Sequence, residues 1–382
     1  MYALADYVAM ADDAPRVAAY LAALKAAVRP GDHVADVGAG FGFFAVAAAR
    51  LGAARVYAIE PNDAIDHGPR LAAQHGVADR IVFLQGRADA FRPERPVDVL
   101  IEDLRGALPT HGRRLDQLAD LAGTWTSAAT RWLTVRDRLM VVPCDVPADD
   151  QRAEGGDADP IGPDLSAVRQ VARATWSRVA AADLAPLGPA VPCITVVPGT
   201  TRSRDVRGRA RTNIVRDGAI DALGVWCDAE LLGGAGFSSG PGTAPSIHGC
   251  VRFPLPAPLP VRAGDEVEMT LALMPDGVDG IWRWRAEVRR DGAIVAAADA
   301  TDLAARLLST TRRARRAPGH VPQAGMRLAL ERALLEAIDG RASLQEIAAT
   351  VHARFPGRFA DAAAALAWVA EAAALLDDAE PR

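Results

Sequence analysis

The chain has 382 residues, of which 50% are hydrophobic and 24% charged, and its formal net charge is −5 at pH 7. This composition excludes a disordered or collagen-like polymer, and the small negative charge does not favour nucleic acid as a partner. No uncharged apolar stretch approaches the roughly 18 residues that span a bilayer, and no secretory signal is visible, so we expect a cytoplasmic protein without a membrane anchor. The four cysteines lie far apart without CxxC spacing, which argues against a zinc site and a disulfide framework.

The length predicts two or three domains at roughly 100–200 residues each. Residues 1–145 alternate helical patterns with short apolar runs, as in a parallel sheet with crossover helices. This region is therefore expected to be a Rossmann-like, doubly wound α/β domain. The expected strands are 33–37, 56–60, 81–84 and 97–101, and the expected helices are 18–28, 43–51 and 70–75.

Residues 146–305 change character and predict an antiparallel β-barrel domain. A polar loop over 146–165 precedes an expected helix over 165–181. The proline run at 254–261 is expected to be a connection, because proline lacks the N–H that a central strand needs. The expected strands are 193–197, 224–232, 251–255, 266–273 and 282–289.

The last part of the chain reads as a separate helical domain. Residues 306–320 form a basic linker, and 321–382 form a small domain with three helices between 323 and 377. Gly340 is expected to end the first helix, and Pro356-Gly357 to separate the second from the third.

A glycine-rich turn follows the first expected strand, with the sequence Asp36-Val-Gly38-Ala-Gly40-Phe-Gly42. Glu60 ends the next strand, and Asp89 follows the third. Glycines let a backbone approach a nucleoside closely, and a carboxylate at a strand end accepts hydrogen bonds from ribose hydroxyls. The GxGxG spacing favours S-adenosylmethionine over a dinucleotide, while a simple strand-to-helix turn is the alternative.

Over about residues 7–305 the chain resembles class I S-adenosylmethionine methyltransferases, and more narrowly the protein arginine methyltransferase family. Besides the glycine motif, the resemblance rests on Met10-x-x-Asp13-x-x-Arg16-x-x-x-Tyr20 and on Ser246-Ile247-His248, which stands where the family has Thr-His-Trp. It implies that Arg16 binds the carboxylate of the cofactor's methionine part and that Met10 packs near the sulfur of the cofactor. The cofactor residues implied by motif and resemblance are Met10, Arg16, Asp36, Gly38, Gly40, Gly42, Glu60, Pro61, Asn62, Ala88, Asp89 and Glu102.

The segment from Val97 to Gly106 resembles the start of the family's double-glutamate loop, with Glu102 as the first glutamate. The second glutamate is absent, since its position falls at His111 or Gly112, and Gly249 replaces the tryptophan after His248. A carboxylate at the pocket edge can orient an acceptor and take up its proton, so Glu102 is the expected catalytic residue and Asp103 the second candidate. The resemblance also implies that His248 pairs with Asp13 across the two domains.

These observations predict an N-methyltransferase acting on an amine or guanidine of a peptide or protein. The C-terminal segment weakly resembles PqqD-like winged-helix modules, which implies peptide recognition in the biosynthesis of ribosomally made peptides, although a plain helical cap is an equally good interpretation. The alternatives are methylation of a free small molecule such as an amino acid, and a non-catalytic peptide-binding adaptor. The resemblance further implies a homodimer, with the helix over 165–181 in the place of the family's dimerisation arm.

Overall fold

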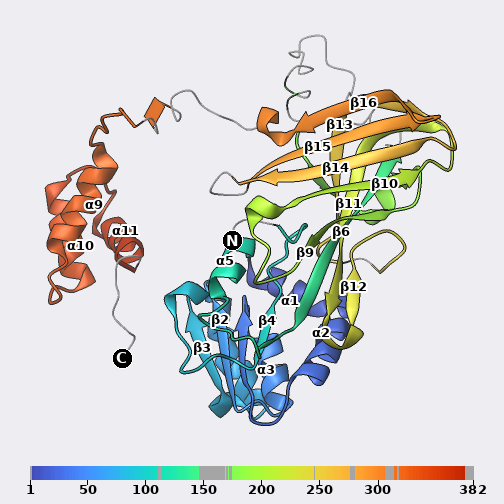
Figure 1. The fold of residues 1–382 in the computed structure, drawn as a ribbon. Coiled ribbons are helices and arrows are strands. Elements are labelled where there is room, and N and C mark those ends of the chain that lie inside the picture. The colour runs from blue at the N-terminus through green and yellow to red at the C-terminus, as the bar shows by residue number, and fades with distance from the viewer. Residues whose placement is uncertain are drawn as a thin grey trace. The chain divides into compact units, whose positions relative to one another are not determined.

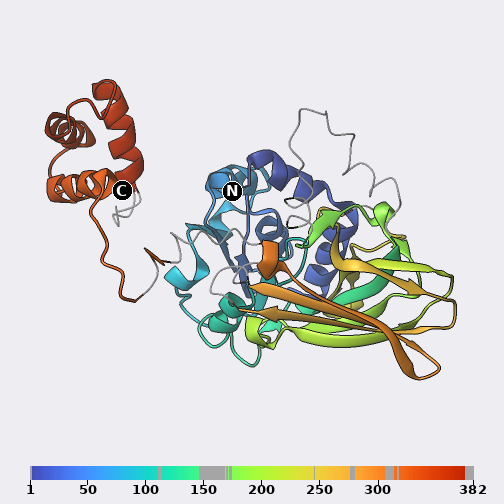
Figure 2. The same cartoon turned by 90° about the horizontal axis from the view of Figure 1, so that it is seen from above.

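The computed structural model of the chain describes residues 2–110, 114–145, 174–244, 246–275, 280–305 and 318–374, together with four isolated residues at 168, 171, 314 and 315. These residues form two units, which divide after residue 306 (Figures 1 and 2). Within the described ranges, no helix has the length and apolar character needed to cross a membrane.

The first unit begins with a five-stranded parallel sheet in the order β3-β2-β1-β4-β5. Its strands are β1 (His33–Val37), β2 (Arg55–Glu60), β3 (Ile81–Gln85), β4 (Val99–Glu102) and β5 (Arg131–Trp132). The helices of this part are α1 (Leu4–Asp12), α2 (Ala14–Ala27), α3 (Phe43–Arg50), α4 (Gly68–Gln74) and α5 (Arg114–Leu121). The predicted doubly wound sheet is thus confirmed, because apolar runs buried on both faces form central parallel strands.

The strand order reverses between β1 and β4, where ligands of open α/β sheets bind. These two strands pair in parallel, with Val37 opposite Glu102. The register therefore places the glycine turn after β1 directly beside the acidic segment after β4.

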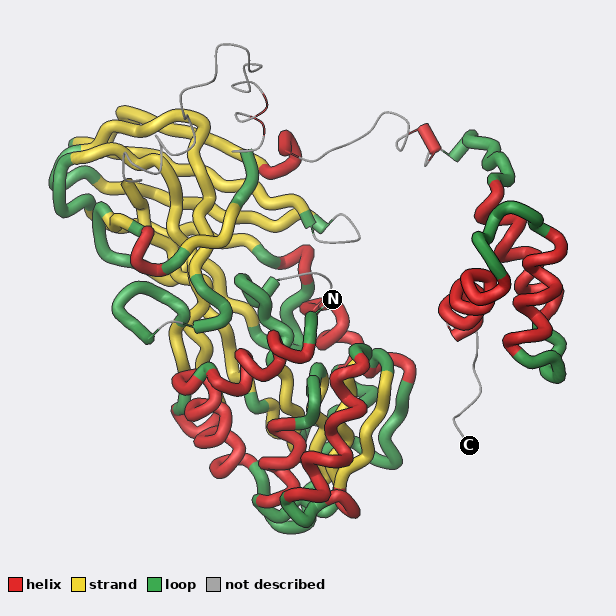
Figure 3. The backbone as a smooth tube through the Cα atoms, turned by 180° about the vertical axis from the view of Figure 1, so that it is seen from behind, coloured by secondary structure: helices red, strands yellow, loops and turns green. Residues whose placement is uncertain are grey.

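The rest of the first unit consists mainly of antiparallel strands. Strands are yellow in Figure 3. One sheet has the order β7-β13-β11-β6-β8, with β9 paired to β6 and β12 paired to β11, and the other has the order β10-β14-β15-β16. Buried apolar side chains from both sheets form one shared core. The strands are β6 (Thr134–Asp145), β7 (Ser177–Val179), β8 (Ala185–Pro186), β9 (Val191–Val196), β10 (Arg207–Asn213), β11 (Gly218–Leu231), β12 (Gly236–Ser238), β13 (Cys250–Val261), β14 (Glu266–Met274), β15 (Ile281–Arg290) and β16 (Ala293–Thr301).

Two expectations for this β domain are wrong. The proline run belongs to β13, which pairs with β11 through Leu259 opposite Ile220. Prolines at every second position leave all the missing N–H groups on one edge, so the other edge remains free to pair. The helix expected over 165–181 does not reach its predicted end, because β7 pairs with the first residues of β13. Most of its first half lies outside the described residues.

The second unit contains α9 (Met326–Ala337), α10 (Leu344–Arg354) and α11 (Ala362–Ala374). They close around their own apolar core, which includes Leu334, Val351 and Val369. The three predicted helices are confirmed, with Gly340 after the first and Gly357 between the second and third, both at positive φ. Residues 318–374 contain no strand, so they do not contain the wing of the predicted winged helix.

Candidate functional site

A cavity of about 1020 Å³ opens at the carboxyl ends of the parallel strands. Its wall comes from α1, from α5, and from the ends of β1, β2, β3 and β4 with the residues that follow them. Three residues of the β domain complete it, Arg178, Ile247 and His248. The predicted site residues that line it are Met10, Gly38, Glu60, Pro61, Asn62, Ala88, Asp89, Asp103 and His248. The predicted residues outside the wall are Asp13, Arg16, Asp36, Gly40, Gly42 and Glu102.

Neighbouring side chains approach the backbone of the glycine turn closely, and a nucleoside-binding turn has to allow such an approach. Gly38 and Gly40 have φ values of 80° and 56°, which non-glycine residues rarely adopt. A Cβ atom on Gly38 would lie 2.2 Å from the Leu104 side chain, and one on Gly40 would lie 2.7 Å from the Tyr7 ring. The positive φ values and these close approaches therefore favour glycine at both positions.

The Glu60 carboxylate is held at the end of β2 by backbone donors. It accepts hydrogen bonds from the Gly40 N–H at 3.0 Å and from the Asn62 N–H at 2.9 Å. The Tyr7 hydroxyl of α1 donates a third at 3.2 Å, and burial together with the Glu60 charge raises the pKa of Tyr7. This oriented carboxylate beside a glycine turn fits the ribose of an adenosyl group.

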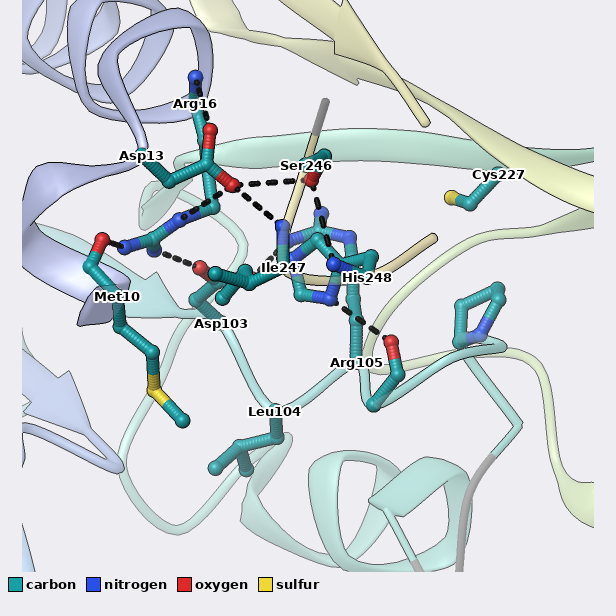
Figure 4. Close-up of polar contacts among 12 residues, drawn as sticks. Met10, Asp13, Arg16, Asp103, Leu104, Arg105, Cys227, Ser246, Ile247 and His248 are labelled. Atoms are coloured by element: carbon teal, nitrogen blue, oxygen red, sulfur yellow. Dashed lines mark hydrogen bonds and ion pairs between the residues drawn. The ribbon is translucent and has the colours of Figure 1, made fainter. Parts of the chain in front are cut away.

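Seven buried charged side chains form a continuous chain of alternating sign between the sheet and the β domain. Asp13 pairs with Arg16, Arg16 with Asp103, Asp103 with Arg105, Arg105 with Asp137, Asp137 with Arg114, and Arg114 with Glu102. Figure 4 shows its first half, from Asp13 to Arg105. We call these seven residues the ionic chain. Four carboxylates face three guanidinium groups, so one negative charge is in excess.

Glu102 and Asp103, adjacent residues at the end of β4, both belong to the ionic chain, but only one of them lines the cavity. The Glu102 side chain is 0% exposed and is bound by the Arg114 guanidinium at 2.8 Å, away from the cavity wall. Asp103, at 10% exposure, lines the cavity. Burial alone would raise the pKa of Asp103, but the guanidinium charges of Arg105 and Arg16 outweigh it and hold that pKa well below its usual range. Asp103, rather than Glu102, therefore presents a full negative charge to the cavity.

His248 lies at the β-domain side of the cavity, without the predicted pairing to Asp13. Its Nδ1 is 2.8 Å from the Gly106 carbonyl, which only accepts, so Nδ1 carries the proton. Asp13 instead accepts hydrogen bonds from Ser246 Oγ and the Ile247 N–H, because its position as N-cap of α2 points it at the turn backbone (Figure 4). Nε2 has no hydrogen-bond partner among the described residues and lies 3.8 Å from Asp103 Oδ1. Burial lowers the pKa of His248, so the imidazole is neutral at pH 7 and Nε2 holds a free lone pair.

Arg16 and Asp36 support the site from behind its wall. The Arg16 guanidinium donates to the Met10 carbonyl and pairs with Asp103, which ties α1 to the end of β4 (Figure 4). Asp36, at the end of β1, is 2% exposed, and burial raises its pKa to about 7. Its Oδ2 atom has no hydrogen-bond partner among the described residues.

Sequence reasoning missed five residues of this region: Tyr7, Arg105, Arg114, Asp137 and Arg178. Tyr7 lies one helical turn before Met10, and that spacing was the available signal. Arg105, Arg114 and Asp137 offered none, because ion pairs between residues up to 32 positions apart depend on the fold. Arg178 offered none either, because only the folded chain brings β7 to the cavity wall.

Comparison with known proteins agrees with this geometry. The family described as ribosomal protein L11 methyltransferase (PrmA) matches residues 15–104. An arginine N(omega)-methyltransferase of Streptomyces achromogenes subsp. streptozoticus is 29% identical over 288 residues, which cover 69% of this chain and 74% of that protein. A probable protein arginine N-methyltransferase 6 of Arabidopsis thaliana is 27% identical over 37% of this chain, and the match spans only 33% of that protein.

Solved structures share the fold. The PRMT1 enzyme-prozyme heterotetrameric complex of Trypanosoma brucei with AdoHcy has a TM-score of 0.69 at 18% identity, covering 77% of this chain and 97% of that one. Protein arginine methyltransferase 10 of Arabidopsis thaliana has a TM-score of 0.64 at 16% identity, covering 78% and 97%. Together with the glycine turn and the oriented Glu60 carboxylate, these similarities show that this chain is a methyltransferase and that its cofactor is S-adenosylmethionine.

Proposed function

We propose that this methyltransferase modifies a terminal nitrogen of a guanidinium group, that of arginine. The ionic chain carries the proposal, because it buries one uncompensated negative charge and only Asp103 among its members lines the cavity. A net charge without a counter-charge is costly in a low-dielectric site, so a cationic acceptor that balances the excess at Asp103 is favoured. A planar guanidinium binds a carboxylate through two parallel hydrogen bonds, which an ammonium group does not do. The arginine methyltransferases among the relatives support the same acceptor.

The reaction forms one C–N bond, breaks one C–S bond and releases one proton from the acceptor. S-adenosylmethionine supplies the electrophilic methyl group when bound. Asp103 orients the acceptor nitrogen, and the free lone pair of His248 Nε2 accepts the proton. Glu60, the glycine turn and Asp89 would hold the adenosyl part, with Met10 near its methionine part and Arg16 supporting Met10 from behind the wall.

The test is a product assay with the full-length protein and S-adenosylmethionine. Arginine and lysine, each free and within otherwise identical short peptides, serve as acceptors, and mass spectrometry detects one or more added methyl groups. We expect methylated arginine and unmodified lysine. Methylation of lysine alone would contradict the guanidinium acceptor.

We also propose that the second unit recognises a peptide, so that the acceptor arginine belongs to a peptide or protein, such as a ribosomally made natural product. Two properties support a recognition role comparable to that of PqqD-like modules. The unit has its own apolar core, and α9 still exposes Leu328 and Leu335, seven residues apart on one helix face, at 54% and 57%.

A free amino acid is the second candidate acceptor. It is favoured by the Streptomyces relative, whose name specifies arginine without a protein and whose match extends over most of both chains. The assay above separates the two candidates through the relative kcat/KM values for the free and the peptide-bound arginine.

A cytoplasmic homodimer completes the proposal. Sedimentation at micromolar concentration is expected to show twice the chain mass of 40.2 kDa, and a single species at the chain mass would contradict it.

A further inference from the structure

The charged side chains in the cavity wall have partners within the protein, with one exception. Asp6 accepts from the Ala3 N–H, Glu60 from two backbone N–H groups, and Arg87 pairs with Asp89. Asp103 pairs with Arg105, and Asp120 pairs with Arg202. Arg178 is exposed and lines the cavity, and its side chain makes no hydrogen bond or ion pair with any residue that the structure describes. Its guanidinium is therefore available to a bound molecule.

Arg178 lies on the side of the cavity that the β domain provides. It belongs to β7 and stands opposite Val251 in β13, just after the turn that carries His248. Gly249 links that turn to β13 with a φ of 62°, and a Cβ atom there would meet only the Val179 carbonyl oxygen, at 3.6 Å. The absence of a side chain at Gly249 leaves the space beside β7 open next to His248.

Outside the adenosyl-binding part, the cavity wall thus contains a carboxylate, that of Asp103, and a guanidinium, that of Arg178. In the proposed function, Asp103 faces the cationic end of the acceptor, and the free Nε2 of His248, 3.8 Å from Asp103 Oδ1, accepts its proton. Arg178 offers two parallel N–H donors, the geometry that matches a carboxylate. A molecule with a guanidinium at one end and a carboxylate at the other complements both ends.

We propose that Arg178 binds a carboxylate of the acceptor and so determines acceptor specificity. This inference rests on the proposed function, since it assigns the far end of an acceptor whose guanidinium lies at Asp103. The carboxylate belongs either to free arginine or to an arginine at the carboxyl end of a peptide, and an arginine inside a peptide lacks it.

The experiment compares L-arginine with agmatine, which is arginine without its carboxylate. The full-length protein is expected to show at least tenfold higher kcat/KM for L-arginine. Arg178→Met is expected to raise KM for L-arginine at least tenfold with little change in kcat, and to leave agmatine turnover within twofold, because only the carboxylate contact is lost. Arg207→Met, an exposed arginine on β10 outside the cavity wall, is the matched control.

Two peptides ending in arginine, one with a free carboxylate and one with an amide, identify the source of the carboxylate. Turnover of the free acid but not the amide assigns it to a peptide terminus, and turnover of L-arginine alone assigns it to the amino acid. Equal turnover of L-arginine and agmatine by the wild type, or an equal effect of Arg178→Met on both, would overturn the inference while leaving guanidinium methylation intact. Weaker S-adenosylhomocysteine binding by Arg178→Met in calorimetry would assign Arg178 to the cofactor and also overturn it. Methylation of neither guanidine would reject the proposed function itself.

Discussion

The role of a single residue in this site depends more on its contacts than on its residue type. Glu102 and Asp103 are neighbouring carboxylates, yet one is bound by Arg114 under the site and the other faces the cavity. Alternate residues of an extended segment point to opposite sides, which accounts for the difference.

A pair of isosteric substitutions separates the two carboxylates. Asp103→Asn is expected to lower kcat/KM for a guanidinium acceptor on the order of 100-fold, because the charge proposed to bind the acceptor is lost. Glu102→Gln is expected to lower the melting temperature and to reduce kcat/KM by less than about tenfold, because it weakens a buried pair outside the cavity. Steady-state kinetics and thermal melting measure both effects, with S-adenosylhomocysteine affinity as the control. A greater kinetic loss in Glu102→Gln would return the catalytic assignment to Glu102.

The neutral imidazole of His248, the proposed proton acceptor, is expected to make the rate depend on pH. Because burial lowers the His248 pKa, the acidic limb of kcat against pH is expected to have its midpoint below the ordinary value of 6.5. His248→Gln is expected to remove this limb and to reduce kcat on the order of 100-fold. A limb that persists in the variant would show that another group accepts the proton.

Asp36 is expected to couple stability to pH. Its pKa of about 7 in the folded protein exceeds the unfolded value near ~3.9, so its contribution is fully present below pH ~4 and is lost as pH rises through 7. The complete shift corresponds to about 4 kcal/mol. Asp36→Asn should therefore become increasingly more stable than wild type between pH 4 and 7, as measured by denaturant unfolding. A stability difference that does not change with pH would contradict the raised pKa.

At the scale of elements, the ionic chain joins the N-terminus of α2, the end of β4, the start of α5 and the strand β6. Each guanidinium is shared by two carboxylates, so every carboxylate of the chain has a cationic partner only when all four elements are in place. The chain thereby fixes the β domain against the sheet and holds Asp103 at the wall of the cavity.

Removing the Arg114 guanidinium, which joins Glu102 of β4 to Asp137 of β6, tests whether the ionic chain holds these elements together. Arg114→Met is expected to destabilise the fold by about 3–5 kcal/mol, because Glu102 and Asp137 remain buried without their shared partner. The double variant Arg114→Met with Glu102→Gln should recover part of the loss, and Arg95→Met, at an exposed pair with Asp98, is the control. Chemical denaturation measures all three. Equal stability of Arg114→Met and Arg95→Met would show that the chain contributes little.

At the scale of the whole molecule, the catalytic and proposed recognition functions lie in separate units. The first unit contains the complete cavity, and the second has its own core. Units with independent cores unfold and evolve independently when few contacts join them.

Deleting residues 318–382 separates the two functions. The shortened protein is expected to keep the melting temperature of the first unit and its kcat/KM for a small arginine acceptor, because the cavity is intact. Its kcat/KM for a long peptide should fall by roughly tenfold or more, since a second binding site in the same chain raises the effective substrate concentration. An equal loss for both substrates would reject the recognition role of the second unit.

The sequence by itself determined the parallel sheet, the glycine turn, Glu60 and the three C-terminal helices, because these depend on local periodicity and on the backbone freedom of glycine. Only the tertiary structure decided that Asp103 rather than Glu102 faces the cavity, that His248 contacts Gly106 rather than Asp13, and that the proline run pairs as a strand. The physical reason is that the free energy of a buried charge, or of a backbone without a donor, depends on partners distant in the sequence. Those partners are brought together only when the two domains fold against each other.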